Sequence, residues 1–267
     1  MKLKEWIYSY RDLFCERDLR FLLKNVFCQN YFSLREDIPL DKKTLDYLEE
    51  IKREYQKGVP LAYLLGKEEF FGWEFKVNPS SFIPRLETER LVEEAIELIK
   101  KNNLKFILDL GTGCGNIGIC LKKILKGEVE IFASDKNFSS LKVARQNIKI
   151  HKVKVNLIQT DLFLGFKKSC FDLIISNPPY VESLDIKGSL EYEPKEALDG
   201  GRCGTEVIKK IILFTPLFLK KEGFLILEIG YNQKEKIISL IRNLDYKVEK
   251  WIKDYSGFFR GVILKYG

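Results

Sequence analysis

Residues 106–125, FILDLGTGCGNIGICLKKIL, decide the fold of this chain. The first five residues are typical of a short buried strand, and the last ten have the apolar spacing of a helix. Between them, Gly111, Gly113 and Gly115 let the backbone turn tightly and bring a ligand against the start of the helix. A strand, a glycine loop and a helix in this order predict one unit of an α/β sheet that binds a nucleoside.

The same alternation of strands and helices extends over most of the chain. Amphipathic helices are predicted over 87–101, 116–126 and 138–151. This pattern predicts a mostly parallel sheet that is covered on both faces. The last strand follows its predecessor too closely for a parallel crossover, so we expect an antiparallel strand at that edge. The predicted strands begin near residues 106, 129, 154, 171, 224, 246 and 258.

The first part of the chain has a different pattern, which predicts a separate domain. Residues 1–67 carry Leu, Phe and Tyr at helical spacing and are expected to form a small helical domain. Residues 68–84, in which Gly72 and Pro79 bracket short aromatic runs, are expected to form a β-hairpin linker. The α/β domain then occupies residues 85–267.

Composition narrows the class of protein. Of the 267 residues, 45% are hydrophobic and 31% are charged, as in compact soluble proteins. The longest apolar runs, such as IILFTPLFL from residue 211, are shorter than the ~18 residues of a membrane span. The six cysteines form no Cys-x-x-Cys pair, and the start of the chain lacks the apolar segment of a signal peptide. We therefore expect reduced thiols, a cytoplasmic location and no membrane partner.

The formal net charge of +7 is unevenly distributed. The first 70 residues carry 13 basic and 13 acidic side chains, whereas the remainder carries 32 and 25. This excess permits an anionic partner such as nucleic acid, although a solvated lysine-rich surface is the commoner explanation. We expect a monomer without a stable nucleic-acid partner.

His151 is the only histidine of the chain. A single imidazole at the end of an amphipathic stretch favours a structural role. With that imidazole assigned to structure, none is left for a Ser-His-Asp triad or a Cys-His pair, and one histidine cannot form a His-rich zinc site. The sequence therefore predicts no metal site, and the chemistry must rely on a cofactor or on positioning.

The glycine loop is followed by acidic residues at the ends of two strands. Asp135 stands twenty residues beyond Gly115, where a carboxylate can accept hydrogen bonds from both ribose hydroxyls. Asp161 follows the third strand and can receive an adenine amino group, with Leu162 or Phe163 covering the ring.

The loop favours a methyl donor without excluding a dinucleotide. Gly113, Gly115 and Gly118 satisfy the G-x-G-x-x-G pattern literally, so NAD stays open on the loop alone. An NAD-dependent oxidoreductase would, however, leave the segment after the fourth strand unexplained.

That segment is Asn177-Pro178-Pro179-Tyr180. Two prolines fix the backbone and remove two N–H donors, so the Asn177 side-chain oxygen and the Pro178 carbonyl are expected to face the cleft as free acceptors. Such a site suits an NH2 group. Tyr180 adds an aromatic face on which a flat amide or base can stack.

These motifs resemble the HemK-type family, the release factor glutamine methyltransferases that use S-adenosylmethionine. The resemblance runs through PLAYLLGKEEFFGWEFKV, FIPRLETE, LDLGTGCG, ASD, SNPPY, EPKEALDGGRCG and LEIGYNQ. Only residues 1–57 lack a specific motif. The chain departs from the family pattern at Leu86, which replaces a usual proline, and at Cys203 and Thr205, which often are Asp and Leu.

The resemblance implies a class I methyltransferase sheet of Rossmann-like type, preceded by a helical domain that recognises the substrate. It implies methylation of the glutamine in the Gly-Gly-Gln motif of class I peptide-chain release factors, with S-adenosylhomocysteine as the product. Asn177, Pro178 and Tyr180 would be catalytic, and together with Pro179 they would hold the glutamine. The cofactor would be held by Gly111, Thr112, Gly113, Cys114, Gly115, Asp135, Asp161, Leu162 and Asn177.

The expected mechanism needs no general base, because two acceptors that hold the amide hydrogens favour the pyramidal nitrogen of the transition state. Glu87, Glu89 and Glu228 are candidate proton acceptors, but helix capping or solvation at a sheet end is the favoured interpretation. The same tetrapeptide also suits an adenine-N6 or cytosine-N4 nucleic-acid methyltransferase, although the neutral first 70 residues argue against one. A ribosomal-protein glutamine methyltransferase and a non-enzymatic ribosome-binding protein remain alternatives.

Overall fold

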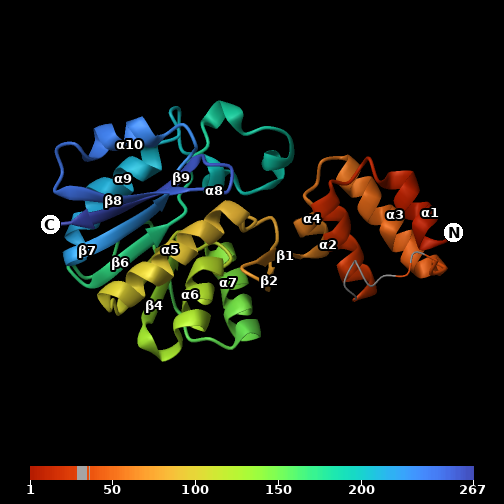
Figure 1. Ribbon diagram of the computed structural model, residues 1–267, viewed down its shortest axis with the longest axis horizontal. Helices are drawn as coiled ribbons and strands as arrows, with labels where there is room; N and C mark the ends of the chain where they lie inside the picture. Colours follow the sequence, from red (N-terminus) through yellow and green to blue (C-terminus); the bar gives the residue numbers. More distant parts are fainter. Residues whose placement is uncertain (29–34, 36) are drawn as a thin grey trace. The chain divides into compact units, whose positions relative to one another are not determined.

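The computed structural model describes residues 1–28, 35 and 37–267. The chain forms two compact units, Met1–Lys67 and Glu68–Gly267. Each unit has hydrophobic clusters of its own. The first unit contains the helices drawn in red and orange in Figure 1, and the second contains the large sheet.

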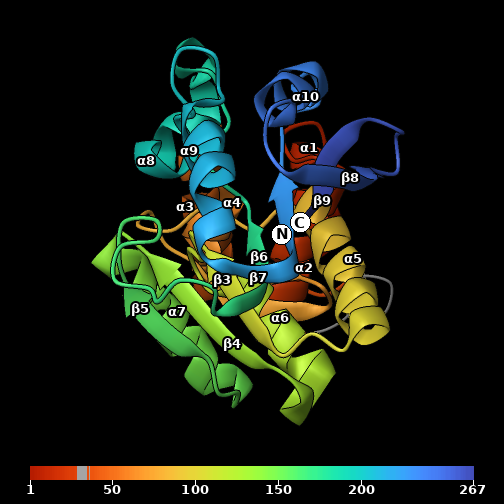
Figure 2. The same ribbon diagram turned by 90° about the vertical axis from the view of Figure 1, so that its left-hand side faces the viewer.

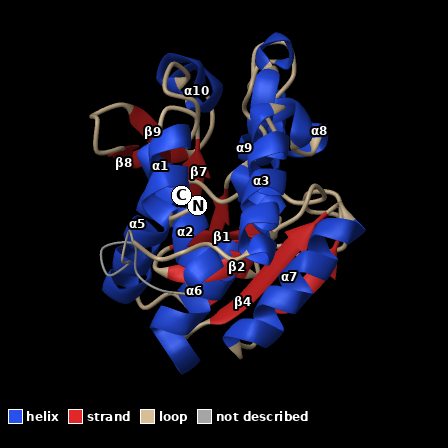
Figure 3. Ribbon diagram, turned by 90° about the vertical axis from the view of Figure 1, so that its right-hand side faces the viewer, coloured by secondary structure: helices blue, strands red, loops and turns tan. Residues whose placement is uncertain are grey.

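Within its described residues, the first unit is built from helices (Figure 3). They are α1 (Leu3–Tyr10), α2 (Glu16–Phe27), α3 (Lys42–Gln56) and α4 (Leu61–Leu65). The helical domain expected over this part of the chain is therefore helical in the structure.

The smaller unit has a capped helix and a buried, hydrogen-bonded tryptophan. Asp41 Oδ1 caps α3 by accepting from the Thr44 N–H at 2.7 Å. Trp6 is fully buried, and its Nε1–H donates to Glu49 Oε1 at 3.0 Å, which satisfies the indole's only polar atom. The buried core consists of Leu3, Trp6, Phe14, Leu19, Leu22, Leu23, Leu48, Ile51 and Leu61.

The second unit is organised around a seven-stranded sheet with the order β5-β4-β3-β6-β7-β9-β8. β3, β4, β5, β6 and β7 run parallel, and β9 is antiparallel to both of its neighbours. The expected antiparallel strand is thus confirmed one place in from the edge strand β8. The strands are β3 (Phe106–Leu110), β4 (Glu130–Asp135), β5 (Asn156–Gln159), β6 (Phe171–Ser176), β7 (Leu219–Glu228), β8 (Tyr246–Lys253) and β9 (Phe259–Tyr266).

Helices cover both faces of the sheet (Figure 2). Successive strand residues point to opposite faces, so Ile107 joins the core beneath one helical layer and Leu108 the core beneath the other. One layer contains α5 (Leu86–Asn102), α6 (Asn116–Leu125) and α7 (Phe138–His151). The other contains α9 (Glu206–Phe214) and α10 (Lys234–Ile241), which the sequence pattern did not locate.

A short hairpin of β1 (Lys67–Phe70) and β2 (Trp73–Lys76) precedes α5. Phe70 and Phe75 are fully buried in the cluster beneath α5 and α6, so the hairpin packs as part of the larger unit. His151 lies against Phe75 with ring centroids 4.6 Å apart, and burial lowers its pKa. The lone histidine therefore has a packing contact at the end of α7.

The remaining short elements lie in the loops of the larger unit. They are η2 (Lys126–Glu128), η3 (Ser183–Asp185), η4 (Gly188–Tyr192), α8 (Lys195–Leu198) and η5 (Thr215–Leu217). In the part of the chain that the structure describes, no helix has the length and apolar character needed to cross a membrane.

Candidate active site

Between β3 and β6 the order in which the chain adds strands to the sheet reverses. A cleft opens there at the carboxyl ends of the strands. Connections from β3 lead to β4 and β5 on one side, whereas β6 lies on the other side of β3. Open α/β sheets bind ligands at such a point. The cleft has a volume of about 690 Å³ and is lined by residues 110–114, 134–136, 160–162 and 176–179, with others between 82 and 88 and between 183 and 211.

The glycine loop after β3 is held by the backbone of β4. The N–H groups of Gly111 and Thr112 both donate to the Ser134 carbonyl at 2.8 Å. Gly111 and Gly113 have φ angles of 76° and 55°, a region that favours glycine. A Cβ at either position would meet no atom within 4 Å, so backbone conformation, not space, requires these two glycines.

A buried carboxylate supports the loop from below. Asp109 is fully buried, and its Oδ2 accepts from Thr112 Oγ1 at 2.6 Å and from the Gly118 N–H at 2.9 Å. Burial raises the pKa of Asp109 to about 6. A Cβ on Gly118 would lie 3.1 Å from that Oδ2, so Gly118 allows α6 to approach β3 closely.

Gly115 differs from the other loop residues proposed to hold the cofactor. Its neighbours Cys114 and Asn116 line the cleft, but Gly115 itself is not among the lining residues. It caps α6 with a φ of 87°, and a Cβ there would lie 3.1 Å from Ile119 Cδ1 and 3.2 Å from Ala144 Cβ. The structure therefore gives Gly115 a role in the turn and in helix packing.

Asp135 ends β4 at the floor of the cleft. Its Oδ2 accepts from the Gly113 N–H at 2.9 Å, and its Oδ1 accepts from the Asn137 N–H at 2.8 Å. Each carboxylate oxygen keeps a lone pair for a ligand, because it has about two acceptor sites. Burial raises the pKa of Asp135, and the two backbone donors oppose that effect.

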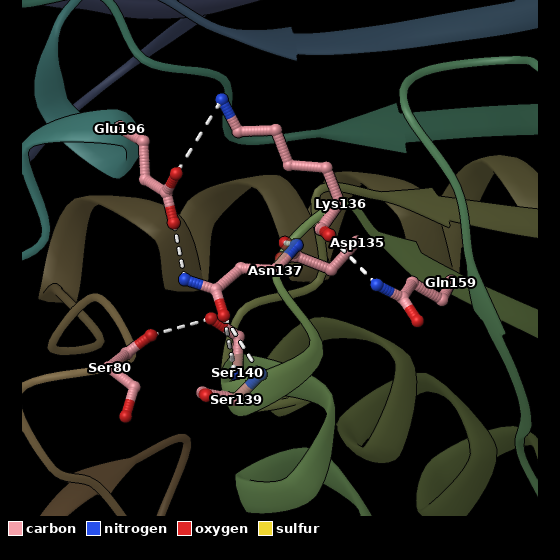
Figure 4. Close-up of polar contacts among 8 residues, drawn as sticks. All are labelled: Ser80, Asp135, Lys136, Asn137, Ser139, Ser140, Gln159 and Glu196. Carbon is pink, nitrogen blue, oxygen red and sulfur yellow. Dashed lines mark hydrogen bonds and ion pairs between the residues drawn. The ribbon is translucent and has the colours of Figure 1, made fainter.

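The segment after Asp135 is fastened from several sides (Figure 4). Glu196 of α8 accepts from Asn137 Nδ2 and lies 3.9 Å from Lys136 Nζ. On the opposite side, the Ser140 hydroxyl donates to the Ser80 carbonyl at 2.6 Å. The loop that presents Asp135 to the cleft is thus fixed before any ligand arrives.

Asp161 and Leu162 lie at the β5 end of the same cleft. Asp161 is exposed and Leu162 is half-buried with a φ of 49°. Phe163, the other residue considered for covering a ring, is buried and stacks on Phe218 with ring centroids 4.7 Å apart. Leu162 is therefore the better placed of the two to contact a ligand.

The tetrapeptide after β6 separates the large cleft from a second cavity of about 180 Å³. Asn177 and Pro178 line both cavities, Pro179 lines only the large cleft, and Tyr180 lines only the second cavity. No group among the described residues donates to the Pro178 carbonyl oxygen. The two residues expected to offer acceptors therefore lie where the cavities adjoin, together with Phe82 and Ala197.

Sequence reasoning missed how the tetrapeptide is held. Tyr180 donates its hydroxyl proton to Glu228 Oε1 at 3.0 Å, and Thr88 donates to Glu228 Oε2 at 2.6 Å. The favoured interpretation of Glu228 as a solvated sheet end is wrong, because its side chain is fully buried where α5 covers the end of β7. Glu89 also does more than cap a helix, since it accepts from the Phe71 N–H at 2.6 Å and ties the hairpin to α5.

A second missed residue, Gln233, fixes the other end of the tetrapeptide. Gln233 Nε2 donates to the Tyr180 carbonyl at 3.0 Å and to the Gly204 carbonyl at 2.9 Å. Gly200 and Gly204 pack so closely that a Cβ on either would lie within 2.8 Å of the Tyr180 backbone. In the sequence, the two glycines lie in the motif ALDGGRCG and Gln233 lies in LEIGYNQ. No role was predicted from the sequence for the residues of these motifs.

A partly buried ion pair lies next to the second cavity, which Arg85 lines. Glu193, whose side chain is 1% exposed, pairs with Arg85 and accepts from the Ile83 N–H at 3.1 Å. The residues at which the chain departs from the family pattern are not part of this ion pair. Leu86 is 49% exposed at the first turn of α5, and Cys203 is exposed.

The residues of the large cleft fit S-adenosylmethionine. The glycine loop, Asp135, Leu162 and Asn177 all line this one cleft, whose volume of about 690 Å³ lies in the range of about 300–1,000 Å³ typical of cofactor and small-molecule pockets. The Asp135 carboxylate has lone pairs free to accept hydrogen bonds from vicinal hydroxyl groups, and Leu162 offers an apolar surface for a base. Asn177, at the other end of the cleft, also lines the second cavity.

Comparison with known proteins shows similarity over most of the chain. Residues 91–193 match the methyltransferase small domain family. The release factor glutamine methyltransferase of Buchnera aphidicola is 36% identical, with 99% of each chain covered, and that of Pasteurella multocida is 36% identical over 82% of this chain and 79% of its own length. The match to the Fusobacterium nucleatum enzyme of the same name, at 35% identity, spans only 61% of that protein.

Solved structures support the fold. A methyltransferase from Pyrococcus furiosus superimposes with a TM-score of 0.53 at 20% identity, covering 84% of this chain and 98% of that one. A ribosomal protein L11 methylase from Lactobacillus delbrueckii gives a TM-score of 0.52 at 20% identity over 68% of this chain and 79% of that one. The sheet with its covering helices is thus a methyltransferase fold.

Proposed function

The chain belongs to the release factor glutamine methyltransferase family, and we propose that it methylates the glutamine of the Gly-Gly-Gln motif in class I peptide-chain release factors. S-adenosylmethionine is the methyl donor, and the acceptor is N5 of the glutamine side chain. The main support for this proposal is that Asn177 and Pro178 line both the large cleft and the small cavity.

The small cavity suits one amino-acid side chain. Its volume of about 180 Å³ is below the ~300–1,000 Å³ typical of pockets for larger ligands. Apolar atoms of Phe82, Tyr180 and Val181 can flank the methylenes of a glutamine, and Asn177 and Pro178 can receive its amide. The balanced charge of the first 70 residues, where a nucleic-acid methyltransferase would be expected to carry a basic surface, favours a glutamine over the adenine-N6 alternative.

The chemistry follows from the two acceptors. When bound, S-adenosylmethionine supplies a methyl group on a positively charged sulfur. Asn177 Oδ1 and the Pro178 carbonyl would accept hydrogen bonds from the two N–H groups of the glutamine amide, which stabilises positive charge as the nitrogen becomes pyramidal. The new nitrogen–carbon bond replaces the carbon–sulfur bond of the donor, and the methylated nitrogen then releases one of its two protons to water. The acceptors are fixed in advance by the contacts of Thr88 and Gln233, so little reorganisation is needed during reaction.

We further propose that Gly111, Thr112, Gly113, Cys114 and Asp135 hold the cofactor, and that Asp161 and Leu162 contact its adenine. The unit Met1–Lys67 serves substrate recognition by contacting the release factor away from its loop. A single glutamine carries too little surface for specificity, whereas a second contact supplies it. The protein acts as a monomer in the cytoplasm, because one chain supplies the lining of both cavities and its substrate is a translation factor.

The test uses the purified chain, labelled S-adenosylmethionine and three acceptors: an intact class I release factor, the same factor with the motif changed to Gly-Gly-Ala, and total cellular DNA and RNA. Mass spectrometry should find one added methylene on the motif glutamine and none on the Ala variant. Label in adenine or in a ribosomal protein, with an unmodified release factor, would overturn the proposal.

A variant lacking residues 1–67 separates recognition from cofactor binding. It should bind S-adenosylhomocysteine like the full chain while methylating intact release factor far more slowly. Equal rates on intact release factor would remove the proposed role of the first unit.

A further inference from the structure

Glu228 is a fully buried carboxylate that lines neither cavity but is hydrogen-bonded to one residue from the lining of each. It is the last residue of β7, and it accepts from two hydroxyl groups. Thr88, at the start of α5, donates to Oε2 at 2.6 Å, and Tyr180 donates to Oε1 at 3.0 Å. A buried charge is unfavourable unless it is bonded in this way, so this network holds three separate segments together.

The Thr88 hydroxyl transmits the charge of Glu228 to Asn177. A threonine hydroxyl has one proton, and here that proton is committed to the carboxylate. The Thr88 oxygen can then only accept, and it does so from Asn177 Nδ2 at 3.1 Å. The planar amide of Asn177 therefore turns its nitrogen toward Thr88 and leaves its oxygen for the cavities.

We propose that Glu228 is a positioning residue for methyl transfer, which acts through the Thr88 hydroxyl to keep the Asn177 oxygen turned toward the glutamine amide; the inference rests on the proposed function. Glu228 makes no contact with the substrate. Its effect is to exclude the flipped amide, in which an NH2 group of Asn177 would face the NH2 group that it has to bind.

Protonation of Glu228 removes the preference for one orientation of the Asn177 side-chain amide. A neutral carboxyl group has a proton of its own to donate, so one of the two hydroxyls must become an acceptor. If that hydroxyl is Thr88, its proton is released to donate to the Asn177 oxygen, and the flipped amide becomes favourable. Activity should therefore require the ionised form.

The surroundings place this protonation near neutral pH. Burial raises the pKa of Glu228 to about 7, the bonds from Thr88 and Tyr180 oppose the rise, and Glu87 adds to it. Arg260 of β9 lowers the pKa, but it is also engaged by Asp254 Oδ2 at 2.9 Å. The kcat for methylation should thus increase as pH rises through about 7.

The matched variants are Glu228→Gln, Thr88→Val and Thr88→Ser. Glu222→Gln is the control, because Glu222 lies on the same strand with a side chain that is 53% exposed. Glu228→Gln and Thr88→Val should lower kcat about 10- to 100-fold with little change in KM for S-adenosylmethionine. Both should lose the pH step near 7, whereas Thr88→Ser should restore activity and pH profile. Glu228→Gln should be at least as heat-stable as the wild type at pH 8, because ionisation of a group with a raised pKa disfavours the folded state there.

A spectroscopic readout makes the test independent of the acceptor. The side-chain amide resonances of Asn177, identified by their absence in Asn177→Ala, should titrate near pH 7 in the wild type and not in Glu228→Gln or Thr88→Val. If the wild type labels another acceptor while these resonances titrate, the proposed function fails and the positioning role stands. Unchanged kcat in Glu228→Gln, or Asn177 resonances without a titration near pH 7, would overturn the positioning role.

Discussion

Replacing Asp135 with alanine should weaken cofactor binding without unfolding the protein. The carboxylate stands at the end of β4 and accepts from the backbone of Gly113 and Asn137. Gly113 lines the cleft and Asn137 is only half-buried, so water can replace the lost carboxylate. The fold around it is also kept by contacts that do not involve Asp135, including the bond from Ser140 to Ser80.

The magnitude follows from the acceptors that a ligand would lose. Two lone pairs of Asp135 remain for ribose hydroxyls, and a hydrogen bond to a charged group contributes ~1.5–3 kcal/mol. Loss of this contribution corresponds to a dissociation constant raised about 10- to 100-fold. Because burial raises the pKa of Asp135, wild-type affinity should also decline as the pH is lowered toward that pKa, and the alanine variant should lack this decline.

Calorimetric titration with S-adenosylhomocysteine measures the effect directly. Asp12→Ala is the control, because the Asp12 side chain is 96% exposed in the first unit. The control should bind like the wild type. An Asp135→Ala dissociation constant within twofold of the wild type, roughly the scatter expected for an uninvolved surface residue, would refute the assignment of Asp135 to the ribose.

Three further substitutions test the site. Asn177→Ala should reduce kcat about 10²- to 10³-fold and leave cofactor affinity within about threefold, as rates and titrations would show; activity above half would contradict the mechanism. Gly204→Ala should lower the free energy of unfolding by about 2–5 kcal/mol, because φ is 67° and the new Cβ would lie 2.5 Å from a backbone oxygen. Urea denaturation should show no such loss for Gly127→Ala, where a Cβ meets nothing within 4 Å. Glu193→Ala should cost about 1–3 kcal/mol because it leaves the buried Ile83 N–H without an acceptor, and an unchanged denaturation midpoint would contradict that role.

The α/β architecture was predictable because its signals are local. The strand at 106–110, the glycine loop and the helices near 116 and 138 each follow from residue periodicity and turn chemistry, and the structure confirms them. Helices α9 and α10 were not located. Their sequences, EVIKKIILF and KEKIISLI, are short and contain compact apolar clusters, and such clusters do not distinguish a buried helix from a strand.

The residues of the candidate site could be predicted from the sequence better than the hydrogen bonds that join them. Sequence pattern placed Asp135 and Asn177 at the ends of strands, where the cleft lies. It could not show that Glu228 is buried, because that depends on α5 crossing the end of β7, far away in sequence. For the same reason it assigned Tyr180 only an aromatic face and missed the bond from its hydroxyl.

The position of Asn177 and Pro178 between two cavities has a consequence for turnover. Under the proposed function, donor and acceptor would meet at this boundary from two adjoining cavities that share only Asn177, Pro178, Phe82 and Ala197 in their linings. The remaining lining residues of each cavity would then be free to release or admit a ligand while the other cavity is occupied. Turnover would in that case not require donor and acceptor to arrive in one fixed order.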